Sequence, residues 1–180
     1  MTAPEASDRD NANGRDSAAQ GESFGDRLRL LLVSFGGLGL LPLAPGTWGT
    51  AGAALVAALA LEFWPLAAEH WLEFSLGMIA WSSLVTITLT PAVERASGKD
   101  AQIIVTDEVA GYFATVALMT EPTLAHLVAA FFVFRLFDIV KPWPGYLLER
   151  LPGGWGVLLD DVMGGIYGAA LFLAVERWAG

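Results

Sequence analysis

The sequence predicts an all-α fold, a compact multi-helix membrane bundle with about four to five membrane-embedded helices and glycine-rich loops at one face. Hydrophobic residues make up 54% of the 180 residues and charged residues only 16%, and the mean hydropathy is +0.52. Soluble domains carry roughly 25% charged residues, and a core of this size cannot hide such an apolar surplus. Several apolar runs are shorter than the roughly 20 residues of a simple span. Short helices favour a compact bundle whose polar ends meet at one membrane face.

The N-terminal segment differs in composition from the rest of the chain. Residues 1–28 are polar, mixed in charge and almost free of large apolar side chains. We expect a disordered tail there, followed by a membrane-embedded domain over residues 29–180. The segment lacks the basic start and apolar core of a signal peptide, so we expect the N-terminus to stay in the cytoplasm.

The first apolar segment follows Arg29 and reads "LLLVSFGGLGLLPLAPGTWGT". Its glycines and prolines predict a re-entrant or interfacial segment and a loop rather than one helix. Thr50 is the expected cap of a helix that ends near Pro65. A second apolar run, residues 71–90, is long enough to span a membrane and stops before Pro91.

Three further helices are expected in the second half of the chain. After the polar connection "AVERASGKDAQ", the run "IIVTDEVAGYFATVALM" is apolar and stops at "TEPT". Residues 124–140 have a helical pattern that ends at "KPWPG". Residues 157–178 form the last predicted helix.

Seven charged residues lie inside or at the ends of apolar segments, where a charge is costly and tends to mark function. They are Asp107, Glu108, Arg135, Asp138, Lys141, Asp160 and Asp161. Structural ion pairs, such as Arg135 with Asp138, and charges at helix N-termini are the alternative interpretation. Acidic groups on three separate helices repel one another, however, and therefore favour a shared positive centre.

That positive centre is expected to be a hard divalent cation. Carboxylate oxygens suit Mg²⁺, which keeps several waters and is commonly shared with substrate phosphate. The chain has no cysteine, and His70 and His126 lie far in sequence from other candidate ligands, so we interpret both histidines as interfacial or packing residues. Gly46 and Thr47 precede a predicted helix, where backbone N–H groups can hold a phosphate oxygen. A simple turn explains that glycine equally well.

Three long motifs together resemble the phosphatidylglycerophosphatase A family. They are "PLAPGTWGT", "IIVTDEVAG" with "FRLFDIVKPWP", and "GGWGVLLDDVMGG", and they occur in family order over about residues 34–168. The resemblance implies a Mg²⁺-dependent, multi-pass phosphatase of the bacterial inner membrane. Such an enzyme removes the terminal phosphate of phosphatidylglycerophosphate and yields phosphatidylglycerol during phospholipid biosynthesis.

The resemblance also implies roles for particular residues. Arg135 and Lys141 fall at the basic positions of the "FRLFDIVKP" motif and would neutralise phosphate charge, and Gly46 and Thr47 are the expected phosphate contacts through their backbone N–H groups. Asp100 resembles the aspartate of an Asp-Pro pair in the family, but Ala101 replaces the proline here. The implied catalytic acids are Asp107, Glu108, Asp138, Asp160 and Asp161, and all of these except Asp138 are implied Mg²⁺ ligands.

Two chemical routes and one other function remain open at this point. Attack by water and formation of an aspartyl-phosphate are both consistent with the residues. Intramembrane acids also line ion paths, so a membrane ion transporter is the alternative, although the chain shows no inverted repeat. The formal net charge of −9 argues against nucleic acid as a partner. The basic loop "KPWPGYLLER" places the site at the cytoplasmic face.

Overall fold

The computed structural model describes residues 24–97 and 102–179, and this part of the chain contains helices and no strand. The all-α prediction is therefore confirmed. The elements in chain order are α2 (Phe24–Val33), η2 (Leu38–Leu40), α3 (Pro45–Phe63), α4 (Pro65–Glu69), α5 (Trp71–Ser97), α6 (Thr106–Val116), α7 (Leu124–Val140), α8 (Gly145–Leu148) and α9 (Gly154–Ala179).

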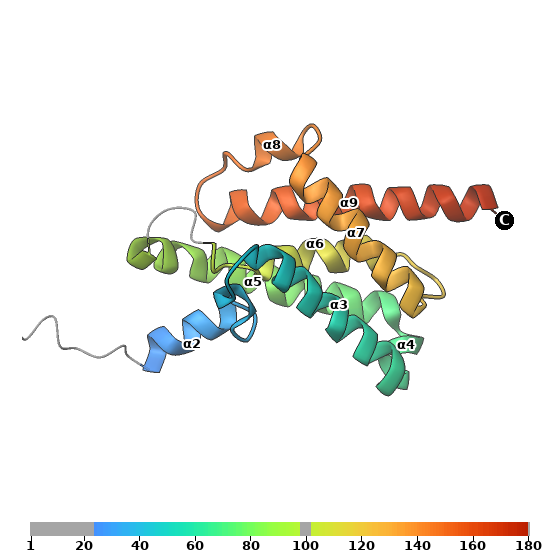
Figure 1. Cartoon of the computed structure of the whole chain (residues 1–180), viewed down its shortest axis with the longest axis horizontal. Helices are drawn as coiled ribbons and strands as arrows, with labels where there is room; N and C mark the ends of the chain where they lie inside the picture. Colours follow the sequence, from blue (N-terminus) through green and yellow to red (C-terminus); the bar gives the residue numbers. More distant parts are fainter. Residues whose placement is uncertain (1–23, 98–101, 180) are drawn as a thin grey trace, which may run out of the picture.

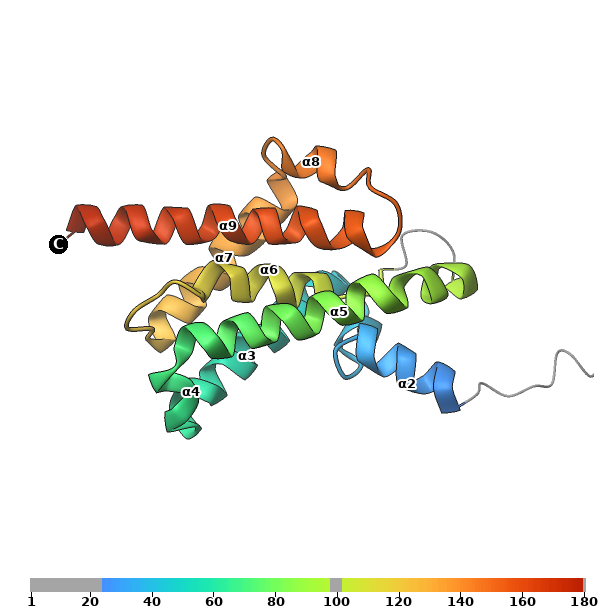
Figure 2. The same cartoon turned by 180° about the vertical axis from the view of Figure 1, so that it is seen from behind.

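The short helix α6 forms the centre of the bundle. It packs against α3, α5, α7 and α9, and Figure 2 shows it between the two long helices α5 and α9. Tyr112 and Phe113 of α6 are fully buried. The Tyr112 hydroxyl donates to Leu127 O at 3.0 Å, and Trp71 Nε1 donates to Val116 O at 2.9 Å. Helix α6 is thus enclosed by protein, and its C-terminal half is held by hydrogen bonds to neighbouring residues.

Among the described residues, three helices are long and apolar enough to cross a membrane: Pro45–Phe63, Trp71–Ala96 and Gly154–Trp178. Large apolar side chains cover the outside of the bundle, for example Leu84 and Phe132, which are 63% and 64% exposed. Such an outer surface suits lipid contact. The structure therefore supports a membrane bundle with three candidate spans, whereas four to five membrane-embedded helices remain a prediction.

The first helices depart from their predicted bounds. Helix α2 begins at Phe24, so residues 24–28 of the expected tail are helical, and residues 1–23 lie outside the described part. Helix α3 begins at Pro45, so Thr50 is not its cap but lies inside the helix, where its Oγ1 donates to Gly46 O at 2.8 Å. Proline favours the first helical position because its fixed φ is already helical and its missing N–H would be unpaired there.

The later helices follow the predicted pattern more closely. Helix α7 spans Leu124–Val140 as expected, and Thr123 caps it by accepting from His126 N. Helix α5 continues through Pro91 to Ser97. Helix α9 begins at Gly154 rather than at residue 157. Asp160 and Asp161 therefore lie about two turns inside α9, deeper than a start at residue 157 predicts, since one turn takes about 3.6 residues.

Candidate active site

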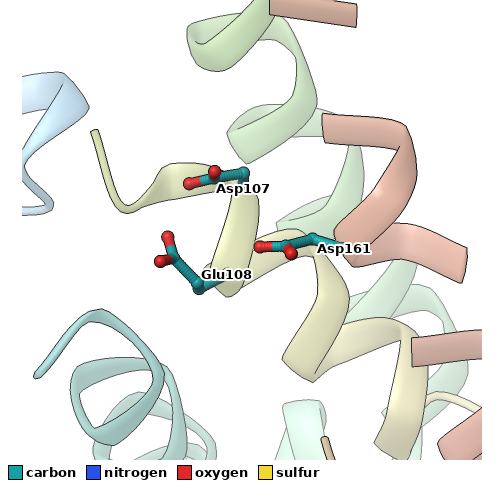
Figure 3. Close-up of side chains that lie close together, drawn as sticks. All are labelled: Asp107, Glu108 and Asp161. Carbon is teal, nitrogen blue, oxygen red and sulfur yellow. The ribbon is translucent and has the colours of Figure 1, made fainter. Parts of the chain in front are cut away.

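Three carboxylates from two helices meet at the start of α6. Asp107 and Glu108 lie in the first turn of α6, and Asp161 reaches them from α9. One ligand oxygen of each lies within 4.8 Å of one from the other two. Figure 3 shows Asp161 directed toward the first turn of α6, where Asp107 and Glu108 lie. We call these three residues the acidic cluster.

Glycines set the close approach that builds the acidic cluster. A Cβ on Gly111 of α6 would lie 2.6 Å from Asp161 O, and a Cβ on Gly165 of α9 would lie 2.3 Å from Gly111 O. Any larger side chain would push α6 and α9 apart. Gly168 also faces α6, whereas the Cβ position of Gly164 has its nearest contact at 3.5 Å, with the backbone N of Asp138 on α7.

The start of α6 is also fixed from its N-terminal side. Val105 N donates to Val33 O at 2.9 Å, which joins the end of α2 to the residue before α6. The hydroxyls of Thr106 and Thr86 are 2.7 Å apart in a buried hydrogen bond. Asp107 thus follows a segment held by both α2 and α5.

Burial makes the acidic cluster electrostatically unfavourable without a cation. Asp107 and Asp161 are only 6% and 4% exposed. Asp107 Oδ1 and Glu108 Oε2 are buried and have no hydrogen-bond partner among the described residues. Burial, and then the charge of Glu108, raise the pKa of Asp107 well above its usual value. Burial likewise raises the pKa of Glu108. Unpaired buried oxygens of this kind fit a hard divalent cation, which prefers oxygen ligands.

Arg135 of α7 adds a positive charge beside Glu108. Its Nη1 lies 2.5 Å from Asp138 Oδ2 in an ion pair one turn along α7. A Cβ on Gly46 would lie 2.1 Å from Glu108 Oε1 and 3.1 Å from Arg135 Nη1. The first turn of α3 therefore touches both groups, and only glycine leaves room for them.

Lys141 forms an ion pair with Asp160, the neighbour of Asp161 in α9. Its Nζ lies 2.6 Å from Asp160 Oδ2 and 3.3 Å from Glu149 Oε2. Burial lowers the pKa of Lys141, but its hydrogen bond with Asp160 and the negative charge there outweigh burial and raise the pKa. The structure thus brings together three of the four expected Mg²⁺ ligands, and it places Asp160 on Lys141 instead.

A cavity of about 400 Å³ opens in front of the acidic cluster. Gly46 lines it, but Thr47 does not, and the Thr47 amide already donates to Ala44 O at 2.9 Å. Asp100 lies outside the described residues. Among the described residues, the polar ones that line the cavity are Glu94, Gln102, Asp107, Glu108 and Arg135.

Sequence reasoning missed Glu94 and Gln102. Glu94 lies in the polar connection "AVERASGKDAQ", where a charged residue is expected at the surface, but helix α5 continues through that region and carries Glu94 to the cavity. The only signal for Glu94 was its distance of a few residues from an apolar helix, and that signal is common to many surface residues.

Three similar proteins are all named as phosphatases that act on phospholipids. The chain is 34% identical to phosphatidylglycerophosphatase A of Haemophilus influenzae, over 84% of this chain and 90% of that protein. It is 30% identical to phosphatidylglycerophosphatase A of Escherichia coli, over 83% and 84%. It is 33% identical to a Bacteroides thetaiotaomicron protein provisionally named phosphatidylinositol-3-phosphatase, over 84% and 94%. No solved structure matches the chain.

The family model for phosphatidylglycerophosphatase A matches residues 31–176. These residues include the start of α6, the Arg135–Asp138 pair and the aspartates of α9. The match supports a phosphatase and gives no support to an ion transporter. The chain belongs to the phosphatidylglycerophosphatase A family.

Proposed function

We propose that the protein hydrolyses the phosphate monoester of phosphatidylglycerophosphate and that Asp107, Glu108 and Asp161 bind the Mg²⁺ that this requires. The observation that carries the proposal is the acidic cluster, whose buried oxygens lack partners and lie next to Arg135. A phosphate monoester brings the negative charge that a bound cation and a guanidinium together can neutralise.

Each residue of the site has a task in this proposal. When bound, Mg²⁺ supplies electrostatic stabilisation of phosphate oxygens and a more acidic bound water. Arg135 offers a planar pair of donors to the phosphate, and Asp138 keeps it oriented through their ion pair. Gly46 leaves room for these groups, and its N–H lies in the first turn of α3, where helix N-termini favour anions.

The carboxylates have two ways to take part in hydrolysis. An unpaired oxygen of Asp107 or Glu108 can accept a proton from the attacking water. Alternatively, an aspartate attacks phosphorus directly and forms an acyl phosphate that water then hydrolyses. Both routes yield phosphatidylglycerol and inorganic phosphate. Trapping of labelled phosphate on the protein would distinguish the second route.

Lys141 and Asp160 support the site from a second side. Their ion pair joins the residue after α7 to α9. The pair therefore fixes the rotation of α9, which directs Asp161 toward α6. In this proposal Lys141 acts mainly by holding α9, and its contact with phosphate is secondary.

The bundle also suits a lipid substrate. The first turns of α3, α6 and the start of α9 lie at the same end of the bundle as the end of α7 (Figure 1). Phosphate can reach this end at the membrane surface while acyl chains remain among the exposed apolar side chains. We propose the bacterial inner membrane as the location, with the site at the cytoplasmic face.

The test is phosphate release by the purified protein in detergent micelles that contain phosphatidylglycerophosphate and Mg²⁺. Phosphatidylinositol 3-phosphate is the second substrate, because one relative carries that name at similar identity. We expect faster release from phosphatidylglycerophosphate, and Asp161→Asn is the inactive control. A preference for the inositol lipid would replace the proposed substrate, and no release from either lipid would contradict the proposal.

A further inference from the structure

Glu94 is an acidic residue of the cavity that has no part in the function proposed above. It lies near the C-terminal end of α5, is half-buried, and lines the same 400 Å³ cavity as Asp107 and Glu108. It is not part of the acidic cluster, whose ligand oxygens lie within 4.8 Å of one another. It therefore faces the space that the substrate would fill, beyond the cluster.

Glu94 also reaches the cavity from a different helix than Arg135, the positively charged residue of the cavity. Arg135 reaches the cavity from α7, whereas Glu94 reaches it from α5. Both helices pack against α6 and α9, and they do not pack closely against each other. Glu94 forms no ion pair with any residue in the described ranges 24–97 and 102–179. Within these ranges, the charge of Glu94 thus does not stabilise the fold through an ion pair.

The chemistry of a carboxylate restricts what Glu94 can bind. An ionised carboxylate only accepts hydrogen bonds, and it repels a phosphate. Its partner in a substrate is therefore a cation or a hydrogen-bond donor, and the donors that a phosphorylated glycerol headgroup offers are hydroxyl groups. The acidic cluster already offers unpaired buried oxygens for a cation. A hydroxyl of the substrate is the partner that remains for Glu94.

The size of the cavity fits this assignment. A volume of about 400 Å³ lies in the range of small-molecule sites and leaves space beside a phosphate group. Gln102 lines the same cavity and is exposed, and its amide can both donate and accept. A small polyol has hydroxyl groups that match these two side chains.

We propose that Glu94 forms a subsite for the polyol of the lipid headgroup and accepts a hydrogen bond from a hydroxyl next to the phosphate monoester. This inference rests on the proposed phosphatase function and adds the feature of the substrate that the cavity recognises. In phosphatidylglycerophosphate that hydroxyl is the free one on the glycerol between the two phosphates. Glu94 is a specificity residue in this view and takes no part in breaking the P–O bond.

The test compares two substrates that differ in one hydroxyl group. One is phosphatidylglycerophosphate, and the other carries 1,3-propanediol in place of the glycerol between the phosphates. For the parent protein with Mg²⁺, we expect kcat/KM to be about tenfold to a hundredfold higher with the glycerol lipid, as a hydrogen bond to a charged group provides. Glu94→Ala should remove this preference, so that kcat/KM becomes the same for the two lipids.

Two further variants complete the comparison. Glu94→Gln keeps the size of the side chain and should retain only part of the preference, because the charge is lost. Glu73 lies in the first turn of the same helix, at its other end, and Glu73→Ala should change kcat/KM for neither substrate. Melting temperatures of all variants check that the proteins are folded.

The outcomes separate this inference from the proposed function. If the parent protein releases no phosphate from the glycerol lipid, the proposed function itself fails. If the parent turns over both lipids equally well, no hydroxyl is recognised and the inference is overturned. An equal loss with both lipids in Glu94→Gln would assign Glu94 to metal binding or to the structure, and this result would also overturn the polyol subsite.

Discussion

The ammonium group of Lys141 lies 2.6 Å from Asp160 Oδ2, so the two adjacent aspartates of α9 have different partners. Asp160 faces the end of α7, whereas Asp161 faces Asp107 and Glu108 at the start of α6. Successive side chains on a helix point about 100° apart, and both residues lie inside regular helix. One aspartate can therefore bind the cation while its neighbour fixes the helix.

Asn substitutions should separate these two roles. Asp161→Asn removes a charged oxygen from the acidic cluster, and we expect kcat/KM for phosphatidylglycerophosphate to fall at least about a hundredfold, or about 2.7 kcal/mol of transition-state stabilisation. Asp160→Asn should cost about tenfold, because it acts only through the position of α9. Steady-state phosphate release measures both. Equal losses in the two variants would contradict the division of roles.

The Lys141–Asp160 pair should show strong coupling in stability. Asp160 is almost fully buried and Lys141 is partly buried. Removing one partner leaves a buried charge unpaired, so Lys141→Met should lower the free energy of unfolding by roughly 3 kcal/mol. Adding Asp160→Asn to Lys141→Met should restore part of that loss. The free energies of unfolding in detergent of the parent, the two single variants and the double variant form a double-mutant cycle. Additive effects of the two changes would show that the pair is unimportant for stability.

Arg135→Lys tests the need for a planar group with two donors. We expect phosphate release to fall at least about tenfold while the melting temperature changes little, because lysine keeps the charge but cannot hold two oxygens in one plane. Arg150→Lys is the matched control, since Arg150 is exposed outside the cavity. Parent-like activity of Arg135→Lys would assign Arg135 to structure alone.

Gly46→Ala tests the contact between α3 and the site. The added Cβ would lie 2.1 Å from Glu108 Oε1, so Glu108 must move away from the acidic cluster. We expect the loss of most phosphatase activity. We also expect weaker Mg²⁺ binding, measured as a higher Mg²⁺ concentration for the half-maximal rate. Gly77→Ala is the control, because its Cβ would meet nothing within 4 Å. Normal Mg²⁺ dependence in Gly46→Ala would contradict the role of Glu108 as a ligand.

Neighbouring glycines of α9 should differ in their tolerance of alanine. A Cβ on Gly165 would lie 2.3 Å from Gly111 O, whereas one on Gly164 would have its nearest contact at 3.5 Å. Gly165→Ala should therefore separate α6 from α9 and lower the melting temperature, while Gly164→Ala should be tolerated. Thermal unfolding in detergent distinguishes them. Similar melting temperatures would show that the close approach of α6 and α9 is not required.

The helices themselves could be predicted from the sequence where local signals are strong. Helix α7 has its predicted bounds because Thr123 caps it and Pro142 follows it. Helix α3 begins six residues before the start that a cap at Thr50 predicts, since a threonine cap and a proline at the first position are competing signals. Helix α5 passes Pro91, where sequence alone favours an end.

The assembly of the site could be predicted only in part. The motif acids Asp107, Glu108 and Asp161 do meet, as expected of charged residues in apolar segments. The separation of Asp160 from Asp161 depends on where α9 begins, and Gly154 lies before the expected start. Glu94 reaches the cavity through the packing of α5 on α6, which no sequence spacing encodes.

The most direct test of a metal site at the acidic cluster is the thermal stability of the purified protein as a function of Mg²⁺ concentration, in the parent and in Asp161→Asn. A ligand that binds only the folded state stabilises it by about 2.7 kcal/mol at a hundred times its dissociation constant. We expect that Mg²⁺ raises the melting temperature of the parent, that excess chelator reverses this, and that Asp161→Asn shows no such rise at the same concentrations. An equal rise in both proteins, or no rise in the parent, would contradict a metal site at Asp107, Glu108 and Asp161.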